Sequence, residues 1–119
     1  MITFHILHRG TGKTLGCRNY LRDNPNSMFL LGDSRPGIQW LFLRHLRADE
    51  QTNSIRGHHH HSTFVLDELT CYSYDRQDYI AQYADLYNFI IYTDASTFTS
   101  DLSPCLRAYV YAHNPEYLL

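Results

Sequence analysis

The sequence predicts an α/β fold, in which helices cover both faces of a mostly parallel sheet to form a three-layer αβα arrangement. Short apolar segments rich in β-branched and aromatic residues alternate along the chain with longer segments of mixed polarity. This alternation is typical of βαβ units, whose strands pair in parallel. The chain has 119 residues, of which 44% are hydrophobic. We therefore expect a single domain over residues 1–119 with a substantial core.

The charge, hydropathy and cysteine content limit the classes of partner and compartment. The formal net charge is -2 at pH 7, so no overall basic field attracts nucleic acid, although the arginines could form a local patch. No apolar run reaches the roughly 18 residues of a membrane span, and the N-terminal stretch lacks the pattern of a signal peptide. Cys17, Cys71 and Cys105 form no CxxC pair. We expect free thiols, no membrane partner and a reducing cytoplasm.

The first half of the chain contains two predicted strand–helix pairs. Residues 2–7 form a short apolar strand that ends at a glycine turn, and residues 13–22 form a helix that Pro25 prevents from continuing. Residues 27–34 are an apolar run closed by a glycine, which suits a strand buried on both faces. Residues 35–50 have one apolar face and are expected to be helical.

The second half contains a polar loop and two further strand–helix pairs. The loop is expected over residues 51–62. The strands are expected over residues 63–69 and 89–96, and the helices that follow them over residues 75–88 and 102–113. Asp75 is the predicted N-cap of the first of these helices, and Pro104 suits the first turn of the second. Pro115 ends that last helix. The predicted order of elements is β-α-β-α-β-α-β-α.

Lys13 is the single lysine of the chain and lies between a glycine and a threonine, directly after the first predicted strand. Glycines let backbone N–H groups approach a phosphate, and a helix N-terminus adds partial positive charge. A lysine supplies a compact charge on a flexible stem, and a threonine hydroxyl can bind Mg²⁺. The predicted phosphate-binding residues are Arg9, Gly10, Thr11, Gly12, Lys13 and Thr14.

The sequence GTGKT at residues 10–14 resembles the second half of the Walker A motif, G-x-x-x-x-G-K-[ST], of the P-loop NTPases. Leu7 occupies the position of the first glycine of that motif. The resemblance to the family extends from residue 2 to about residue 110 and implies a minimal P-loop NTPase core that binds ATP and Mg²⁺. It implies that Lys13 contacts the β- and γ-phosphates and that Thr14 ligates the metal. The alternative is a chance glycine-rich turn.

The sequence FVLDE at residues 64–68 resembles a Walker B motif, in which an apolar strand brings acidic side chains to the carboxyl edge of the sheet. The resemblance implies that Asp67 binds Mg²⁺, directly or through water, and that Glu68 polarises the attacking water. This Asp-Glu order is typical of the NTPase division whose catalytic glutamate follows the Walker B aspartate. A solvated acidic end of an ordinary strand is the alternative.

Two later positions are candidates for nucleotide-sensing residues. The strand at residues 89–96 contains Thr93 and Asp94 near its end, where that NTPase division often has a polar residue that contacts the γ-phosphate or the water. Residues 101–111 loosely resemble a stretch of viral and phage genome-packaging ATPases and of the morphogenesis ATPases of filamentous phages. That resemblance implies a catalytic intersubunit or sensor role for Arg107. An ordinary strand end and a plain surface arginine are the alternatives.

Two further patterns each have two interpretations, and a third has an expected place but no assigned role. The histidines 58–61 are expected to lie in a polar loop without a closed metal site, and a metal-binding or DNA-facing loop is the alternative. Tyr79, Tyr83 and Tyr87 recur every four residues, which indicates core packing or a contact with a subunit or nucleic acid. Residues 33–35 follow the second strand and should lie near the same sheet edge as the acidic pair.

Together these motifs predict a Mg²⁺-dependent ATPase. The resemblance implies a homo-oligomer, because such domains usually act as oligomers in which an arginine of a neighbour completes the site. The resemblance suggests a viral or phage-type motor that moves nucleic acid, in the cytoplasm of the host if viral. A second hypothesis is a reduced nucleotide-binding regulatory or assembly module with little or no hydrolysis, which the missing first glycine favours and the Asp-Glu pair opposes. A small nucleotide kinase ranks last because the sequence shows no arginine-rich lid.

Overall fold

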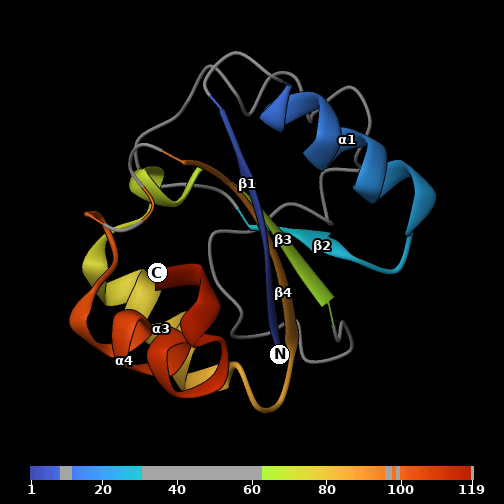
Figure 1. Ribbon diagram of the computed structural model, residues 1–119. Helices are drawn as coiled ribbons and strands as arrows, with labels where there is room; N and C mark the ends of the chain where they lie inside the picture. Colours follow the sequence, from blue (N-terminus) through green and yellow to red (C-terminus); the bar gives the residue numbers. More distant parts are fainter. Residues whose placement is uncertain (9–11, 31–62, 96–97, 99, 119) are drawn as a thin grey trace.

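Four parallel strands form one sheet in the order β1-β4-β3-β2 (Figure 1). The computed structural model describes residues 1–8, 12–30, 63–95, 98 and 100–118. The strands are β1 (Ile2–Leu7), β2 (Met28–Phe29), β3 (Thr63–Asp67) and β4 (Asn88–Asp94). All three pairings are parallel, so the predicted parallel sheet is confirmed for the described strands.

Strand β4 lies between β1 and β3 and is hydrogen-bonded to both. Ile2 pairs with Phe89 at one end of the β1–β4 ladder, and Leu7 pairs with Asp94 at the other. On the other side of β4, the last residue of β3, Asp67, pairs with Tyr92. The carboxyl ends of these three strands therefore meet at one edge of the sheet.

The described helices cover opposite faces of this sheet. Helix α1 (Lys13–Asp23) packs on one face, and helices α3 (Tyr74–Tyr83) and α4 (Pro104–His113) pack together on the other (Figure 1). Short 3-10 helices, η2 (Leu69–Cys71) and η3 (Pro115–Leu118), follow β3 and α4. This arrangement is an α/β fold compatible with the predicted three-layer αβα core.

Strand side chains divide between two apolar clusters, because successive residues of a strand point to opposite faces. Val65 and Tyr92 pack with Cys17 of α1 in one cluster. The larger cluster, under α3 and α4, contains Phe64, Leu66, Phe89, Ile91, Ile80, Leu106 and Val110. Burial on both faces explains why these strands are nearly continuous apolar runs.

Two serines cap the helices of the second half. The hydroxyl of Ser103 accepts a hydrogen bond from the Leu106 amide at 3.2 Å and caps α4. Pro104 follows directly and lies in the first turn, as predicted. The predicted N-cap of α3, Asp75, is wrong: the cap is Ser73, whose hydroxyl accepts from the Arg76 amide at 3.4 Å. Asp75 lies in the first turn, where its charge favours the helix dipole. The pattern could not distinguish two acceptors placed so close together.

Helix α3 ends at Tyr83, so Tyr87 lies beyond the helix although the four-residue spacing predicted otherwise. The tyrosines nevertheless contact one another in sequence, with ring centroids 4.8 Å apart for Tyr79–Tyr83 and 5.8 Å apart for Tyr83–Tyr87. All three pack against the larger core cluster, and Tyr87 meets the edge of Phe64. The core-packing interpretation of these tyrosines agrees with this arrangement.

Several predicted features lie outside the described residues. They are the second strand beyond Leu30, the helix at residues 35–50, the loop with histidines 58–61, and Asp33, Ser34 and Arg35. The described part of the second strand is short, but Leu30 extends its pairing by donating its amide to Val65 O at 3.0 Å. In the part of the chain that the structure describes, no helix has the length and apolar character needed to cross a membrane.

Candidate functional site

The segments that leave β1, β4 and β3 begin side by side at the carboxyl edge of the sheet. The amide of Ala95, directly after β4, donates to Leu7 O of β1 at 2.8 Å. The amide of Glu68, directly after β3, donates to Tyr92 O of β4 at 2.7 Å. These two bonds extend both ladders beyond the strands and bring the end of β1, the predicted sensor position and the acidic pair to one edge.

The turn into α1 has the backbone conformation that a glycine allows. Gly12 has φ 92 and ψ 35, in the left-handed region, and is the N-cap of the helix. Its carbonyl accepts the first helical hydrogen bond from Gly16 at 2.8 Å. Lys13 and Thr14 are the first two helical residues, as predicted, while Arg9, Gly10 and Thr11 and the side chains of Lys13 and Thr14 lie outside the described residues.

Leu7, which replaces the first glycine of the Walker A pattern, is the last residue of β1. It pairs with Asp94 as an ordinary strand residue. Among the described residues, positive φ angles occur at Gly12 and Glu68 and not at Leu7. The strand therefore continues through position 7, and the backbone there does not require a glycine.

The acidic pair is buried. Asp67, the last residue of β3, is 2% exposed, and Glu68 is 8% exposed. The solvated-strand-end interpretation does not fit this burial. Glu68 has φ 66 and ψ 105, which is unusual for a residue with a side chain and is a form of strain that often accompanies functional sites.

A hydrogen bond joins Glu68 to the predicted sensor position. The hydroxyl of Thr93 donates to Oε1 of Glu68 at 3.2 Å, and Thr93 is 0% exposed. The same Oε1 lies 3.5 Å from the Thr70 amide, at the start of η2. The carboxylate is therefore restrained from β4 and from its own 3-10 turn. The prediction for Thr93 was a contact with the γ-phosphate or the water, and this bond to Glu68 was not predicted.

Helix α1 approaches β4 closely at Gly16, next to the glycine turn. A Cβ built at Gly16 would lie 2.9 Å from Cε1 of Tyr92. The ring of Tyr92 also stacks on the ring of His5, with centroids 4.5 Å apart. Burial raises the pKa of the Tyr92 hydroxyl above its usual value. This packing determines how near the N-terminal turn of α1 lies to the sheet edge.

A buried glutamine supports the segments that follow β3 and β4. Nε2 of Gln77 donates toward three carbonyl oxygens, of Leu69 at 3.3 Å, Tyr72 at 3.2 Å and Asp101 at 3.1 Å. Its Oε1 accepts from the Ser103 amide at 2.7 Å. Sequence analysis missed this network. The available signal was a glutamine three residues before Ile80, on the apolar face of the helix.

Tyr72 adds a second buried bond near the same turn. Its hydroxyl donates to Leu30 O at 2.6 Å and so joins the segment after β3 to the end of β2. Burial is the main reason that the pKa of this hydroxyl is raised well above its usual value. The hydroxyl is therefore a stable donor at any pH near neutrality.

Arg107 lies exposed in the first turn of α4, where its amide donates to Ser103 O at 2.8 Å. An exposed arginine is suited either to a contact with another molecule or to an ordinary surface position.

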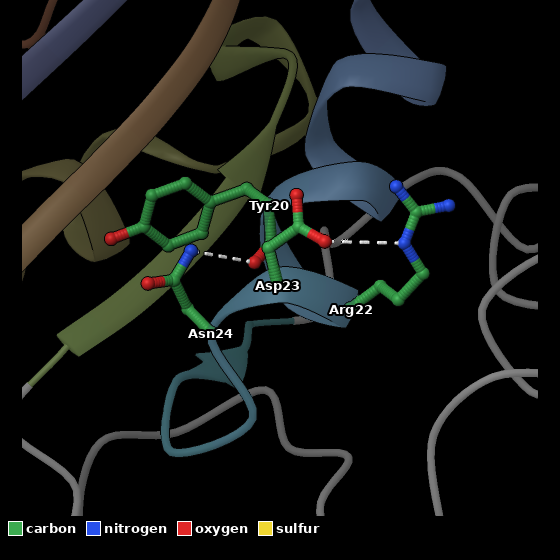
Figure 2. A network of polar contacts seen from close by, with 4 residues as sticks. All are labelled: Tyr20, Arg22, Asp23 and Asn24. Carbon is green, nitrogen blue, oxygen red and sulfur yellow. Dashed lines mark hydrogen bonds and ion pairs between the residues drawn. The ribbon is translucent and has the colours of Figure 1, made fainter.

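A cavity of about 220 Å³ lies at the opposite edge of the sheet, where α1 ends, and is lined by Tyr20, residues 23–27 and Thr63. Figure 2 shows the contacts of this helix end: the Asn24 amide group donates to Tyr20 O at 2.9 Å, and Arg22 Nε lies 3.3 Å from Asp23 Oδ1. The ion pair is exposed and contributes little to stability. These bonds complete the end of a helix, and none of the predicted site residues lies among them.

The donor chemistry at the carboxyl edge fits Mg²⁺. Within the described ranges, no three His, Cys, Asp or Glu side chains gather in a way that could hold a metal ion by themselves. Mg²⁺ does not need such a group, because it is usually bound through one or two carboxylates together with waters and substrate phosphates. Asp67 supplies one such carboxylate at this edge.

The chain matches no protein-family model, no curated protein and no solved structure.

Proposed function

We propose that this chain binds ATP with Mg²⁺ at the carboxyl edge of its sheet and hydrolyses it. The observation that supports this most directly is the strand order, in which β4 lies between β1 and β3. That order brings the end of β1, Thr93 and the Asp67–Glu68 pair to neighbouring positions. Ligands of open parallel sheets lie outside the carboxyl ends of the strands.

Phosphate binding is assigned to the first turn of α1. The left-handed Gly12 begins the helix, so the first amide groups of α1 face out from its N-terminus with partial positive charge. Lys13, the only lysine of the chain, adds a full charge at the β- and γ-phosphates. Thr14 and Asp67 would ligate Mg²⁺, which would supply neutralisation of the phosphate charge when bound.

Hydrolysis is assigned to Glu68. Its carboxylate orients the attacking water and accepts a proton from it while the water oxygen forms a bond to the γ-phosphorus. The bond from that phosphorus to the bridging oxygen breaks, which leaves ADP and phosphate, and the proton passes to the phosphate product. Such catalysis consists of positioning and charge stabilisation, for which a buried and restrained carboxylate is suited.

The direct test compares ATP binding and hydrolysis by the natural protein, Lys13→Ala and Glu68→Gln, with Mg²⁺ present. We expect Lys13→Ala to weaken binding at least tenfold, and Glu68→Gln to keep the affinity while turnover falls about a hundredfold or more. Arg22→Ala, at the exposed far end of α1, is the control and should change neither quantity. If the natural protein binds no nucleotide, the proposed function is wrong and GTGKT at residues 10–14 is a glycine-rich turn without a phosphate-binding role.

A regulatory or assembly module with slow or no hydrolysis is the second candidate. The observation that favours it is the engagement of Glu68, whose Oε1 already accepts from Thr93 and lies near the Thr70 amide. A single-turnover assay separates the two candidates. Tight binding with no phosphate release over many hours would favour the module.

The finer proposal is a viral or phage-type motor that acts as a homo-oligomer on nucleic acid. Its support is the resemblance of residues 101–111 together with the exposure of Arg107 on α4. Mixing inactive Glu68→Gln subunits with Arg107→Ala subunits tests the oligomer. If Arg107 completes a neighbour's site, the mixture recovers activity that neither variant has alone. Stimulation of turnover by added DNA or RNA tests the nucleic-acid partner.

A further inference from the structure

We propose that Thr93 is a positioning residue, which holds the carboxylate of Glu68 in place and does not itself bind the γ-phosphate. The proposal rests on the proposed hydrolysis at Asp67 and Glu68. It differs from the nucleotide-sensing contact that the family resemblance implies for Thr93. Three features of the site support it, which are the burial of Thr93, the direction of its side chain and the restraint of Glu68.

The hydroxyl of Thr93 is already committed to Glu68. A hydroxyl has a single hydrogen to donate, and here it is directed to Oε1 of Glu68 at 3.2 Å. Thr93 is fully buried, at 0% exposure. To donate to a phosphate oxygen, the side chain would have to break this bond and reach a surface that it does not touch.

The side chain of Thr93 points to the side of the sheet on which Glu68 lies. Alternate residues of β4 face opposite sides of the sheet. Tyr92 packs with Cys17 of α1, whereas Ile91 belongs to the cluster under α3 and α4. Thr93 therefore faces the same side as Ile91, where η2 and Glu68 lie.

Glu68 needs a restraint of this kind. The last torsion of a glutamate side chain has only a broad preference, so the plane of the carboxylate is determined by its contacts. The Glu68 backbone is attached to β4 through its amide, which donates to Tyr92 O at 2.7 Å, and it has the unusual φ of 66. Thr93 follows Tyr92 directly, so consecutive residues of the central strand position the backbone and the carboxylate of Glu68.

The test compares the natural protein with Thr93→Val, Thr93→Ser and the control Thr3→Val. Thr93→Val removes the donor and keeps the shape, whereas Thr93→Ser keeps the donor and loses a methyl group. Thr3→Val removes a threonine hydroxyl from β1 near the opposite edge of the sheet, where it pairs with Ile90. The measured quantities are kcat and KM for ATP and the dissociation constants for ATP and ADP.

We expect Thr93→Val to lower kcat about ten- to a hundredfold, because a small misplacement of a reacting group has effects of this size. The dissociation constants and KM should change by less than about twofold, and Thr93→Ser should restore kcat to within about threefold of the natural value. Thr3→Val should leave all of these quantities unchanged. If Thr93→Val does not fold, Thr93→Ala removes the same donor without adding a methyl group at that position.

Three results would overturn the proposal while leaving the ATPase function intact. They are an unchanged kcat in Thr93→Val, a selective loss of ATP over ADP affinity, and a failure of Thr93→Ser to rescue turnover. By contrast, a natural protein that hydrolyses no ATP would overturn the proposed function, and with it the role of Thr93.

The contact itself can be tested without nucleotide. In urea unfolding, the double variant Thr93→Val/Glu68→Ala should shift the midpoint by less than the sum of the shifts of the two single variants. The reason is that each substitution removes the same bond. The shifts of Thr3→Val and Glu68→Ala should add. Additive shifts for Thr93→Val and Glu68→Ala would show that the bond is not made in solution, and the proposal would be wrong.

Discussion

Gly16 of α1 lies directly against the ring of Tyr92 of β4, so that a Cβ at position 16 would be 2.9 Å from Cε1 and 3.3 Å from Cδ1. The ring cannot easily move away, because Tyr92 is buried and stacks on His5. The absence of a side chain at position 16 thus determines how closely the first turn of α1 approaches the central strand. This distance affects both stability and the proposed phosphate site.

Gly16→Ala should destabilise the protein by about 1 kcal/mol, because about 1–3 kcal/mol of overpacking outweighs about 1 kcal/mol of gained helix propensity. It should also weaken ATP binding, since Lys13 and Thr14 move with the helix. Urea unfolding and ATP titration measure the two effects. In a Tyr92→Leu background the ring is gone, and the same alanine should stabilise the protein. A destabilising Gly16→Ala in that background would contradict the steric explanation.

At Glu68, glycine should be more stable than alanine. Both substitutions remove the carboxylate, so the comparison isolates the backbone, whose φ of 66 is unfavourable for any residue with a Cβ. We expect Glu68→Gly to exceed Glu68→Ala by about 1 kcal/mol in the free energy of unfolding. Gln82 is an exposed position of α3 and serves as the control. There, Gln82→Ala should be more stable than Gln82→Gly by about 1 kcal/mol, because alanine favours a helix. Equal stabilities of the two Glu68 variants would indicate that the backbone relaxes in solution.

Gln77→Leu should destabilise the protein by about 3 kcal/mol. Gln77 is 1% exposed, and its loss leaves the buried Ser103 amide and the nearby carbonyls without their partner. This destabilisation should exceed that from the loss of a single surface hydrogen bond, because several buried groups lose their partner at once. Gln82→Leu, an exposed glutamine of the same helix, is the matched control and should change stability by less than about 0.5 kcal/mol. A small effect of Gln77→Leu would mean that water replaces the amide.

Cys105 should react slowly with alkylating reagents although it is exposed. The negative charge of Asp78 is the main cause that raises the pKa of the Cys105 thiol, with smaller contributions from desolvation and a hydrogen bond to Asp78. A raised pKa lowers the reactive thiolate fraction at pH 7–8, so the rate should rise with pH to a midpoint above that of an ordinary cysteine.

Asp78→Asn should therefore shift the alkylation profile of Cys105 to lower pH and increase the rate severalfold at pH 8. Iodoacetamide labelling of the folded protein reports on Cys105 because Cys17 and Cys71, which are also free thiols, are buried. Asp75→Asn is the control for a general change in charge, because Asp75 lies in the first turn of α3, the helix that also contains Asp78. Equal profiles for Asp78→Asn and the natural protein would show that Asp78 does not act on the thiol.

Several elements could be predicted from the sequence because their signals are local. The strand at residues 2–7 was predicted with the bounds that it has, since a short β-rich segment ends there at glycines. The strand predicted over residues 63–69 was found at its predicted start but ends two residues earlier, at Asp67, because Glu68 has a positive φ and a 3-10 helix follows. Pro104 marked the first turn of α4, because a proline suits that position and few others in a helix.

The contacts that complete the site could not be predicted because they depend on which strands become neighbours. The bond from Thr93 to Glu68 exists because β3 pairs with β4, and local pattern says nothing of that pairing. The end of α3 at Tyr83 was missed for a related reason: the tyrosine spacing continues to Tyr87, but there the chain already turns toward β4. Gln77 was overlooked because a single polar residue on an apolar face has no distinctive local signal.

The pairing of β1 with β4 has a consequence for the growing polypeptide. Among the described residues, the first strand of the chain finds its sheet partner in the last strand, and this pairing begins where Phe89 donates its amide to Met1 O at 2.8 Å. During synthesis β1 therefore has no sheet partner until β4 has left the ribosome, and its apolar side chains stay exposed to solvent until then. Contacts so distant in sequence slow folding and prolong the exposure of aggregation-prone segments. The carboxyl edge of the sheet, where β1 meets β4, is among the last parts of the described structure to be assembled.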